Sequence, residues 1–335
     1  MKVDAHLAPD LARVPASARA LEAMGYDGLT TAETNHDPFL PLVLAAEHTE
    51  RVALTTSIAV GFARSPMLLA NLGHDLNAYS KGRFTLGLGS QIKPHITKRF
   101  SMPWGPPAEK MRELVLAMRA IWASWYEGRK LEFVGRHYTH TLMTPAFTPE
   151  NRQYGAPRVI LAAVGPRMTE VAGEVADGMI VHPFSTVRYI ESVTLPAIER
   201  GLAKAGRARE NFEISYANFV VSGATEEEFL AAKRATCERI AFYGSTPAYR
   251  DVLESIHAGA LQPELNALSK QGRWKEMGTL IDDRILEAFA VVGEPQTIVP
   301  EMLRRYGRFV DRTSATFPFA DADMRRQMID ALRAA

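Results

Sequence analysis

The sequence predicts an α/β protein, a (β/α)8 TIM barrel with a helical insertion late in the chain. Strand-like and helix-like segments alternate along nearly all of the 335 residues, as in folds built from parallel strands. The strand segment at residues 52–62 is rich in apolar and β-branched residues, which is typical of a strand covered on both faces. No G-x-G-x-x-G follows the first strand, which disfavours the runner-up fold, an open doubly wound sheet.

The first half of the chain supplies four strands, each followed by a helix. Pro15 suits the first turn of the first helix, and Gly25 suits the position just past its end. Apolar residues recur at three- and four-residue steps from Met111 to Trp125, and this stripe indicates core packing on the fourth helix. The strands are predicted at residues 2–8, 27–33, 52–62 and 83–89, and the helices at 15–24, 41–49, 66–79 and from 106 or 107 onward.

The second half repeats the pattern after a loop through residues 149–157. Thr225 and Glu228 form a capping-box signature that opens a helix to about Tyr243. The other elements are strands at residues 158–164, 178–182, 212–221 and 313–317, and helices at 167–175, 186–205 and 295–306. Between residues 244 and 287 the alternation breaks into short helical pieces. We therefore expect one domain, residues 1–335, whose insertion at 244–287 covers part of the barrel mouth or, alternatively, forms a helical patch or a dimer contact.

The composition limits the classes of function. Lys and Arg number 39 and Asp and Glu 38, so the formal net charge of +1 gives no electrostatic reason to bind nucleic acid or an anionic membrane. One cysteine, Cys237, excludes an intrachain disulfide framework and a cysteine metal cluster. The start on a strand-like pattern and the lack of a membrane-length apolar run predict a cytoplasmic protein.

Functional side chains of such a barrel gather at the carboxyl ends of its strands. Gly87 and Gly89 lack a Cβ and would let a planar ligand approach the strand at 83–89, although crowding inside the barrel explains them equally well. Gly165 and Pro166 begin a strand–turn–helix junction whose free N–H groups could hold a phosphate, although many such turns bind nothing. The candidate positions are His6, residues 34–37, residues 56–58, residues 87–91, residues 164–167 and His182.

Other chemistries fit this sequence less well. His6 is the only histidine of the first strand, whereas metal-dependent barrel hydrolases use two there. His137 and His140 have no evident third ligand. A Ser-His-Asp hydrolase would need a G-x-S-x-G turn, which the sequence lacks. We therefore predict no metal site.

The strand ends, taken in order, resemble the luciferase-like monooxygenase superfamily of flavin and deazaflavin oxidoreductases. The resemblance covers nearly the whole chain, and its most specific stretches are residues 30–38, 54–62, 80–89, 165–168 and 172–178. The last two are similar to the coenzyme F420-dependent branch, and the insertion with its flanks, residues 242–293, resembles an actinobacterial subgroup of it.

The resemblance implies roles for individual residues. Asn35 and His36 match a polar residue followed by a histidine near the reactive face of the cofactor ring, which makes His36 the candidate proton donor; a packed, non-catalytic histidine is the alternative. Ser57 and Ile58 match a non-prolyl cis peptide that backs the ring. The further implied cofactor contacts are Gly87, Gly89 and Ser90 under the ring and Ala163, Val164, Gly165, Pro166, Arg167 and Met168 at the phosphate, and the candidate substrate contacts are Gln91, His95 and His182.

The implied function is hydride transfer between the deazaflavin C5 of coenzyme F420 and a small organic substrate. An unperturbed imidazole pKa of about 6.5 suits His36 to proton transfer near neutrality. The alternatives are an FMN-dependent monooxygenase on the same barrel and a cofactor-binding barrel without turnover. The expected partners are a small-molecule substrate and a second copy of the chain in a homodimer, without nucleic acid or membrane.

Overall fold

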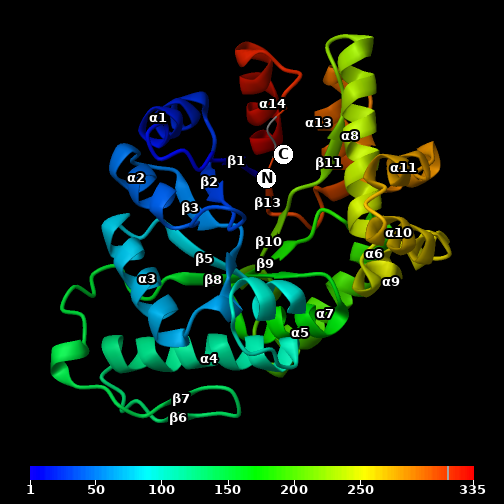
Figure 1. The fold of residues 1–335 in the computed structure, drawn as a ribbon. Coiled ribbons are helices and arrows are strands. Elements are labelled where there is room, and N and C mark those ends of the chain that lie inside the picture. Colours follow the sequence, from blue (N-terminus) through cyan, green and yellow to red (C-terminus); the bar gives the residue numbers. More distant parts are fainter. Residues whose placement is uncertain (315–316) are drawn as a thin grey trace.

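The computed structural model describes residues 1–314 and 317–335. In this part of the chain, eight parallel strands form a closed barrel surrounded by helices (Figure 1). The ring closes because β3 pairs with β5 and β1 pairs with β13. The predicted TIM barrel is therefore confirmed. Around the ring the strands are β1 (Lys2–His6), β2 (Gly28–Thr31), β3 (Ala53–Thr56), β5 (Phe84–Gly89), β8 (Arg158–Ala163), β9 (Gly178–Val181), β10 (Glu213–Tyr216) and β13 (Arg312–Ser314).

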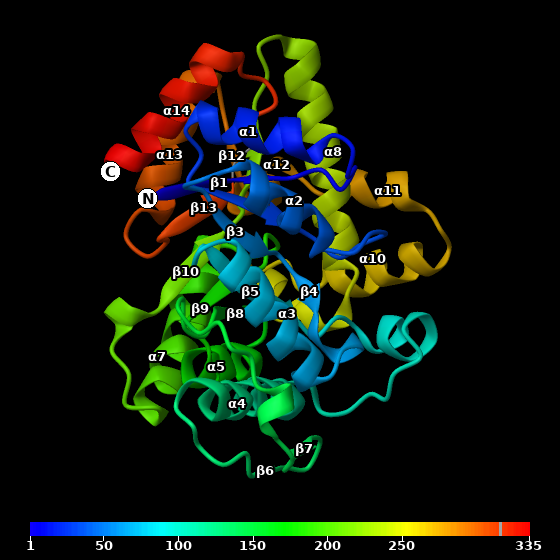
Figure 2. The same cartoon turned by 90° about the vertical axis from the view of Figure 1, so that its left-hand side faces the viewer.

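Most of the helices cover the outside of the barrel, as Figures 1 and 2 show from two directions, while α8 stands to one side. Trp122 and Trp125 of α4 are among the largest fully buried side chains. None of the helices in the described ranges is long and apolar enough to cross a membrane. They are α1 (Val14–Met24), α2 (Leu40–His48), α3 (Pro66–Tyr79), α4 (Pro107–Tyr126), α5 (Pro166–Val175), α6 (Val187–Tyr189), α7 (Leu195–Lys204), α8 (Glu226–Gly244), α13 (Pro295–Tyr306) and α14 (Ala322–Ala334).

Two of the predicted strands are divided in the structure. The segment 52–62 is not one strand, because β3 ends at Thr56 and the chain resumes as β4 (Ala59–Val60), which pairs with β5. The segment 212–221 divides into β10 and β11 (Phe219–Val221), and β11 pairs with β12 (Ala290–Val292) outside the barrel. Of the strand predicted at 313–317, residues 315 and 316 lie outside the described residues. The sequence patterns did not predict α14, β12 or the hairpin of β6 (Phe133–Val134) and β7 (Thr139–His140).

A buried ion pair closes the amino-terminal end of the barrel. The Arg312 guanidinium donates to the Asp4 carboxylate, and its Nε lies 3.6 Å from Glu213 Oε1. A Cβ on Gly28 would overlap the Asp4 carboxylate, so this position requires glycine. Burial raises the pKa of Asp4 to about 6 although Arg312 opposes the shift. The carboxyl ends of the same strands are left as the open mouth of the barrel.

The insertion packs beside the carboxyl end of β9. Its helices gather with α8 on one side of the molecule (Figure 1) and enclose a second apolar core that includes Phe184, which follows β9. Phe184 stacks on Phe289 with ring centroids 4.5 Å apart, and the hydroxyls of Thr186 and Ser255 are 3.2 Å apart. The insertion therefore lies on the mouth side, not at the opposite end. Its helices are α9 (Arg250–Glu254), α10 (Leu261–Lys270), α11 (Trp274–Thr279) and α12 (Asp283–Phe289).

Candidate active site

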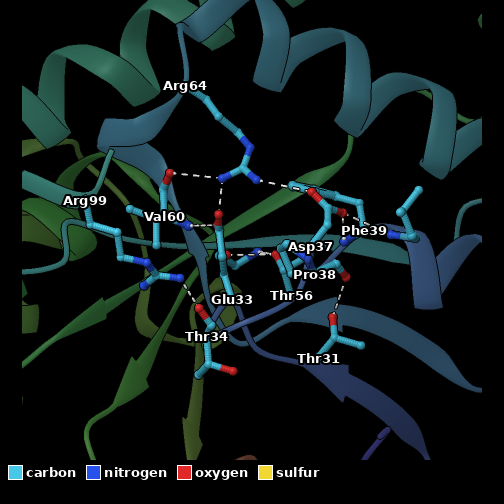
Figure 3. A network of polar contacts seen from close by, with 12 residues as sticks. Thr31, Glu33, Thr34, Asp37, Pro38, Phe39, Thr56, Val60, Arg64 and Arg99 are labelled. Atoms are coloured by element: carbon cyan, nitrogen blue, oxygen red, sulfur yellow. Dashed lines mark hydrogen bonds and ion pairs between the residues drawn. The ribbon is translucent and has the colours of Figure 1, made fainter. Parts of the chain in front are cut away.

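The loop after β2 carries His36 as an exposed side chain. Among the residues that the structure describes, the imidazole has no hydrogen-bond or ion-pair partner. The loop backbone is fixed on both sides of it, because the Arg99 guanidinium donates to the Thr34 carbonyl and the Thr31 hydroxyl donates to the Pro38 carbonyl at 2.7 Å (Figure 3). Asp37 Oδ1 accepts the N–H of Phe39 at 2.8 Å and so caps the start of α2. A free imidazole is thus presented on a well-anchored loop.

The bulge between β3 and β4 lies beside this loop. The Ser57–Ile58 peptide bond is cis, which confirms the predicted non-prolyl cis peptide. The Ser57 N–H donates to the Thr31 carbonyl at 2.6 Å, and the Glu33 N–H donates to the Ile58 carbonyl at 3.0 Å. Both hydrogen bonds connect the bulge to the end of β2, the strand that leads to His36.

The side chain of Glu33 also bonds to the bulge segment, in addition to its backbone N–H. Its Oε2 accepts the Val60 N–H at 2.7 Å and Nη1 of Arg64 at 2.6 Å, and only 7% of its side chain is exposed. Nη2 of Arg64 lies 3.4 Å from Asp37 Oδ2 (Figure 3). The contact between Glu33 and Arg64 could not be predicted, because 31 residues separate them. The signal that could have identified Glu33 is a carboxylate as the last residue of the strand predicted at 27–33.

The two glycines of β5 are explained by packing between strands. A Cβ on Gly87 would overlap the Thr56 carbonyl, and a Cβ on Gly89 would lie 2.9 Å from Ile58 Cδ1. The Thr56 hydroxyl also accepts the Gly87 N–H at 2.9 Å. Both glycines therefore allow the end of β5 to approach β3 and the bulge, which is the crowding alternative of the sequence analysis. Contact between these glycines and a ligand stays a prediction.

Ser90 and Gln91 lead the chain out of β5. Gln91 has a positive φ of 58°, and its own side chain accepts the Ile92 N–H at 3.0 Å. His95 is exposed in the turn His95–Arg99, and no polar partner of its ring lies among the described residues. The same turn supplies Arg99, whose guanidinium reaches the loop of His36.

The start of α5 is an open helix N-terminus. Gly165 precedes the helix in an extended conformation, and no side chain caps it. The N–H groups of Arg167 and Met168 face outward from the first turn, since Thr169 is the first residue whose N–H returns to Gly165. The Arg167 side chain is exposed and forms no ion pair within residues 1–314 and 317–335. This arrangement can hold an anion. It lies at the carboxyl end of β8, because only Val164 and Gly165 separate Ala163, the last residue of β8, from the helix.

His182 lies in an aromatic enclosure at the end of β9. Its Nδ1 accepts the Phe184 N–H at 3.0 Å, so the ring proton of the neutral form is on Nε2. The ring centroids of Tyr243 and Tyr249 lie 4.7 Å and 5.1 Å from that of His182. Burial lowers the pKa of His182 to about 4, so this imidazole is neutral at physiological pH. Sequence analysis did not assign the two tyrosines to the site, because they come from the end of α8 and from the insertion.

The structure places the predicted residues at the ends of four consecutive strands of the ring, and His182 follows β9, the strand next to them. The loop of His36 follows β2, the bulge follows β3, Ser90 follows β5 and the open helix start follows β8, and these strands are neighbours in the ring. His137 and His140 belong instead to the β6–β7 hairpin beside α4. The described residues contain no group of three or more His, Cys, Asp or Glu side chains placed around one point.

Comparison with known proteins identifies one family and several similar proteins. A family model described as luciferase-like monooxygenase matches residues 2–312. The uncharacterized protein Rv1360 of Mycobacterium tuberculosis is 56% identical over 323 residues, which are 96% of this chain and 95% of that protein. The 5,10-methylenetetrahydromethanopterin reductase of Archaeoglobus fulgidus is 25% identical over 275 residues, which cover 82% of this chain and 79% of the reductase.

A solved structure has the same fold. The coenzyme F420 dependent tetrahydromethanopterin reductase from Methanopyrus kandleri superposes with a TM-score of 0.77 at 22% identity, and the match covers 99% of this chain and 96% of the reductase. The resemblance inferred from the strand-end motifs is therefore confirmed, and the relatives include F420-dependent reductases. By its sequence and its barrel, the chain belongs to the family of luciferase-like monooxygenases.

Proposed function

We propose that the protein is an F420-dependent oxidoreductase that transfers a hydride between the deazaflavin C5 of coenzyme F420 and a small organic substrate in the cytoplasm. The observation that carries this proposal is the placement of three features on neighbouring strands: a free imidazole after β2, a bulge after β3 and an open helix N-terminus after β8. Two of the relatives are named as methanopterin reductases, and one of these is named as F420-dependent.

The residues fit a cofactor that joins a planar ring to a phosphate. Orphan N–H groups at the start of α5 would bind the phosphate, helped by the helix dipole and by the unpaired Arg167. The backbone of Ser57 and Ile58 would lie against the ring, with Gly87, Gly89 and Ser90 beside it. Asn35, Ala163, Val164 and Met168 would complete the contacts. FMN also joins a planar ring to a phosphate, so the cofactor has to be identified by measurement.

When bound, coenzyme F420 supplies a two-electron hydride carrier at C5 of its deazaflavin. A polarised C=O or C=C that receives the hydride becomes an anion and needs a proton. His36, as an imidazolium, would give that proton and would regain one from water. Gln91, His95 and the neutral His182 would contact the substrate, and His182 can offer it an Nε2–H donor.

We also propose that the protein forms a homodimer through α2 and α3. These adjacent helices expose an apolar patch made of Leu40, Val43, Leu68, Leu72 and Tyr79, whose exposed fractions range from 36% to 57%. An apolar groove of about 330 Å³ lies within the patch, between Val43 and Leu72. An exposed apolar patch on two adjacent helices suits a second copy of the same two helices.

The proposal is tested by titrating the purified protein with coenzyme F420 and, separately, with FMN. Cofactor absorbance and fluorescence report binding, and a panel of aldehydes, ketones and enones then reports turnover of the reduced cofactor. Micromolar binding of F420 with turnover supports the proposal. Micromolar binding of FMN with none of F420 would instead favour the FMN-dependent monooxygenase. Binding of F420 without turnover of any substrate would favour a cofactor-binding barrel.

A further inference from the structure

We propose that Glu33 and Arg64 are positioning residues, which fix the loop of His36 and the 57–58 bulge relative to each other. This inference rests on the proposed function, in which His36 serves as proton donor and the bulge backs the cofactor ring. Glu33 lies within the matched stretch 30–38, but the resemblance gives its side chain no role, and Arg64 lies outside the matched stretches. Their role follows from what their side chains join.

Glu33 bonds to the bulge segment through both its backbone and its side chain. The backbone N–H donates to the Ile58 carbonyl at 3.0 Å, and Oε2 accepts the Val60 N–H at 2.7 Å. The same oxygen accepts Arg64 Nη1 at 2.6 Å. A carboxylate is therefore required here, since a glutamine would turn a neutral amide toward the guanidinium and lose the ionic part of the contact.

Arg64 extends the connection to the residue next to His36. Nη1 also donates to the Val60 carbonyl at 3.3 Å, while Nη2 lies 3.4 Å from Asp37 Oδ2 (Figure 3). The planar guanidinium serves these partners at once, which the point charge of a lysine cannot do. Its carbon atom Cζ also lies 5.3 Å from the centre of the Phe39 ring, which restricts the side chain further.

The network leaves His36 as the free part of a fixed loop. Asp37 is held by Arg64, the Thr34 carbonyl is held by Arg99, and Glu33 is held by the bulge. A histidine that must meet one carbon or oxygen of a bound substrate needs such backbone support when, as here, no described residue bonds to its ring. The network also explains why the Glu33 side chain is buried, although charged side chains of folded proteins mostly lie at the surface.

The test uses the full chain with the substitutions Glu33→Gln and Arg64→Lys. Glu132→Gln is the matched control, because Lys130 is the one ion-pair partner of Glu132 among the described residues and its side chain is 61% exposed. Hydrogen exchange of the cofactor-free protein is measured on peptides that cover residues 33–40 and 57–63. We expect faster exchange in both segments for each network variant, no change in the barrel strands β9 and β10, and no effect of the control. If both network variants kept the melting temperature of the parent and showed unchanged exchange in residues 33–40, the assignment of Glu33 and Arg64 as positioning residues would be overturned.

A second readout separates positioning from simple stability. The Cε1–H resonance of His36 in an NMR spectrum should shift or broaden in Glu33→Gln, whereas that of the distant, exposed His257 should stay in place. Affinity for coenzyme F420 should fall by about ten- to a hundredfold in a variant that is still folded. Because both residues act in one network, the double variant should lose little more than either single variant. Additive losses, or a resonance that does not move, would contradict a shared positioning role.

The outcomes also distinguish this inference from the proposed function. Failure of the wild-type protein to bind F420 would remove the proposed function, while the exchange and NMR measurements would still decide whether the network holds the loop. Normal F420 binding by the wild type together with equal affinity in both variants would overturn the inference alone. Should Glu33→Gln not fold, Arg64→Lys keeps the buried charge and provides the same comparison.

Discussion

His36 and His182 lie at the same end of the barrel but differ in burial and in hydrogen bonding. His182 uses Nδ1 to accept a backbone N–H and is enclosed by two tyrosines, so burial holds its pKa at about 4. His36 has no polar partner among the described residues and stands exposed on a fixed loop. His36 is therefore free to meet a substrate, whereas His182 is suited to orient a substrate by a hydrogen bond.

Replacing His36 by alanine should lower turnover with F420 by about 10²- to 10⁴-fold, the usual contribution of a general acid or base. Affinity for F420 should change much less, because the imidazole is not among the groups proposed to hold the cofactor. Steady-state kinetics and an F420 titration of the same preparation give both numbers. Equal turnover in variant and parent, on a substrate whose hydride step limits the rate, would exclude His36 as the proton donor.

Replacing Arg167 by glutamate should weaken F420 binding strongly while the melting temperature stays close to that of the parent. The new carboxylate would repel the phosphate and oppose the dipole of α5, whereas Arg167 makes no ion pair with a described residue whose loss could unfold the chain. Isothermal titration calorimetry measures the affinity. An unchanged affinity would remove Arg167 from the cofactor site.

The residues of the candidate site were predictable to different extents. Motif matches were sufficient for His36, the 57–58 bulge and the start of α5, because each lies in a contiguous stretch. Glu33, Arg64 and Arg99 could not be found in this way, since their contacts arise only when separate segments come together in the barrel. The glycines of β5 were found, but the structure shows that packing against Thr56 and Ile58 already requires them.

At the scale of elements, the alternation of strands and helices located each unit, while strand ends depended on tertiary contacts. Residues 52–62 are mostly apolar or β-branched, yet the chain leaves the barrel at the bulge because Glu33 and Thr31 bond to its backbone. Residues 212–221 divide because β11 finds a second partner in β12, which lies about 70 residues away in the sequence. Local patterns contain no signal for such partners.

The insertion should control the environment of His182, and Tyr249→Ala tests this. Removing the phenol ring admits water to the imidazole and lessens the desolvation that disfavours its charged form, so the pKa of His182 should rise from about 4 toward 6.5, by about one unit. An NMR titration of the histidine resonances measures the change. Leu142→Ala, an exposed position outside the insertion, is the control. A pKa that stays near 4 would mean that the insertion does not shield the site.

The same substitution has a consequence for stability against pH. A histidine with a folded pKa of about 4 and an unfolded pKa of about 6.5 binds more protons when unfolded in that window, so its contribution to stability is lost as the pH falls from about 6.5 to 4. With a folded pKa nearer 6.5, Tyr249→Ala should lose less stability than the parent over that range. Denaturant unfolding at several pH values measures the difference, and parallel curves would contradict it.

At the scale of the whole molecule, the barrel was predictable because alternation and buried strands each point to parallel strands. Ring closure was part of that prediction, and the structure adds which strands close the ring, β3 with β5 and β1 with β13. The exposed patch on α2 and α3 is also a property of the assembled fold, because its residues come from two helices.

Replacing Leu72 by glutamate should convert the proposed dimer to monomers. The charge would be buried in an apolar contact without a partner, which costs several kcal/mol in such interfaces. Size-exclusion chromatography with light scattering gives the mass in solution. Leu142→Glu, on the far more exposed loop after β7, should leave the mass unchanged. A monomeric parent would contradict the proposed dimer. A Leu72→Glu variant that stays dimeric would place the interface elsewhere.

We expect the mouth formed by β2, β3, β5 and β8 to bind coenzyme F420, and a crystal structure of the protein with F420 bound would test this. The deazaflavin ring should lie against the backbone of Ser57 and Ile58, with one face open toward His36. The phosphate should lie at the N–H groups of Arg167 and Met168. A ring bound away from the 57–58 bulge, or a phosphate that does not touch the start of α5, would contradict this binding mode.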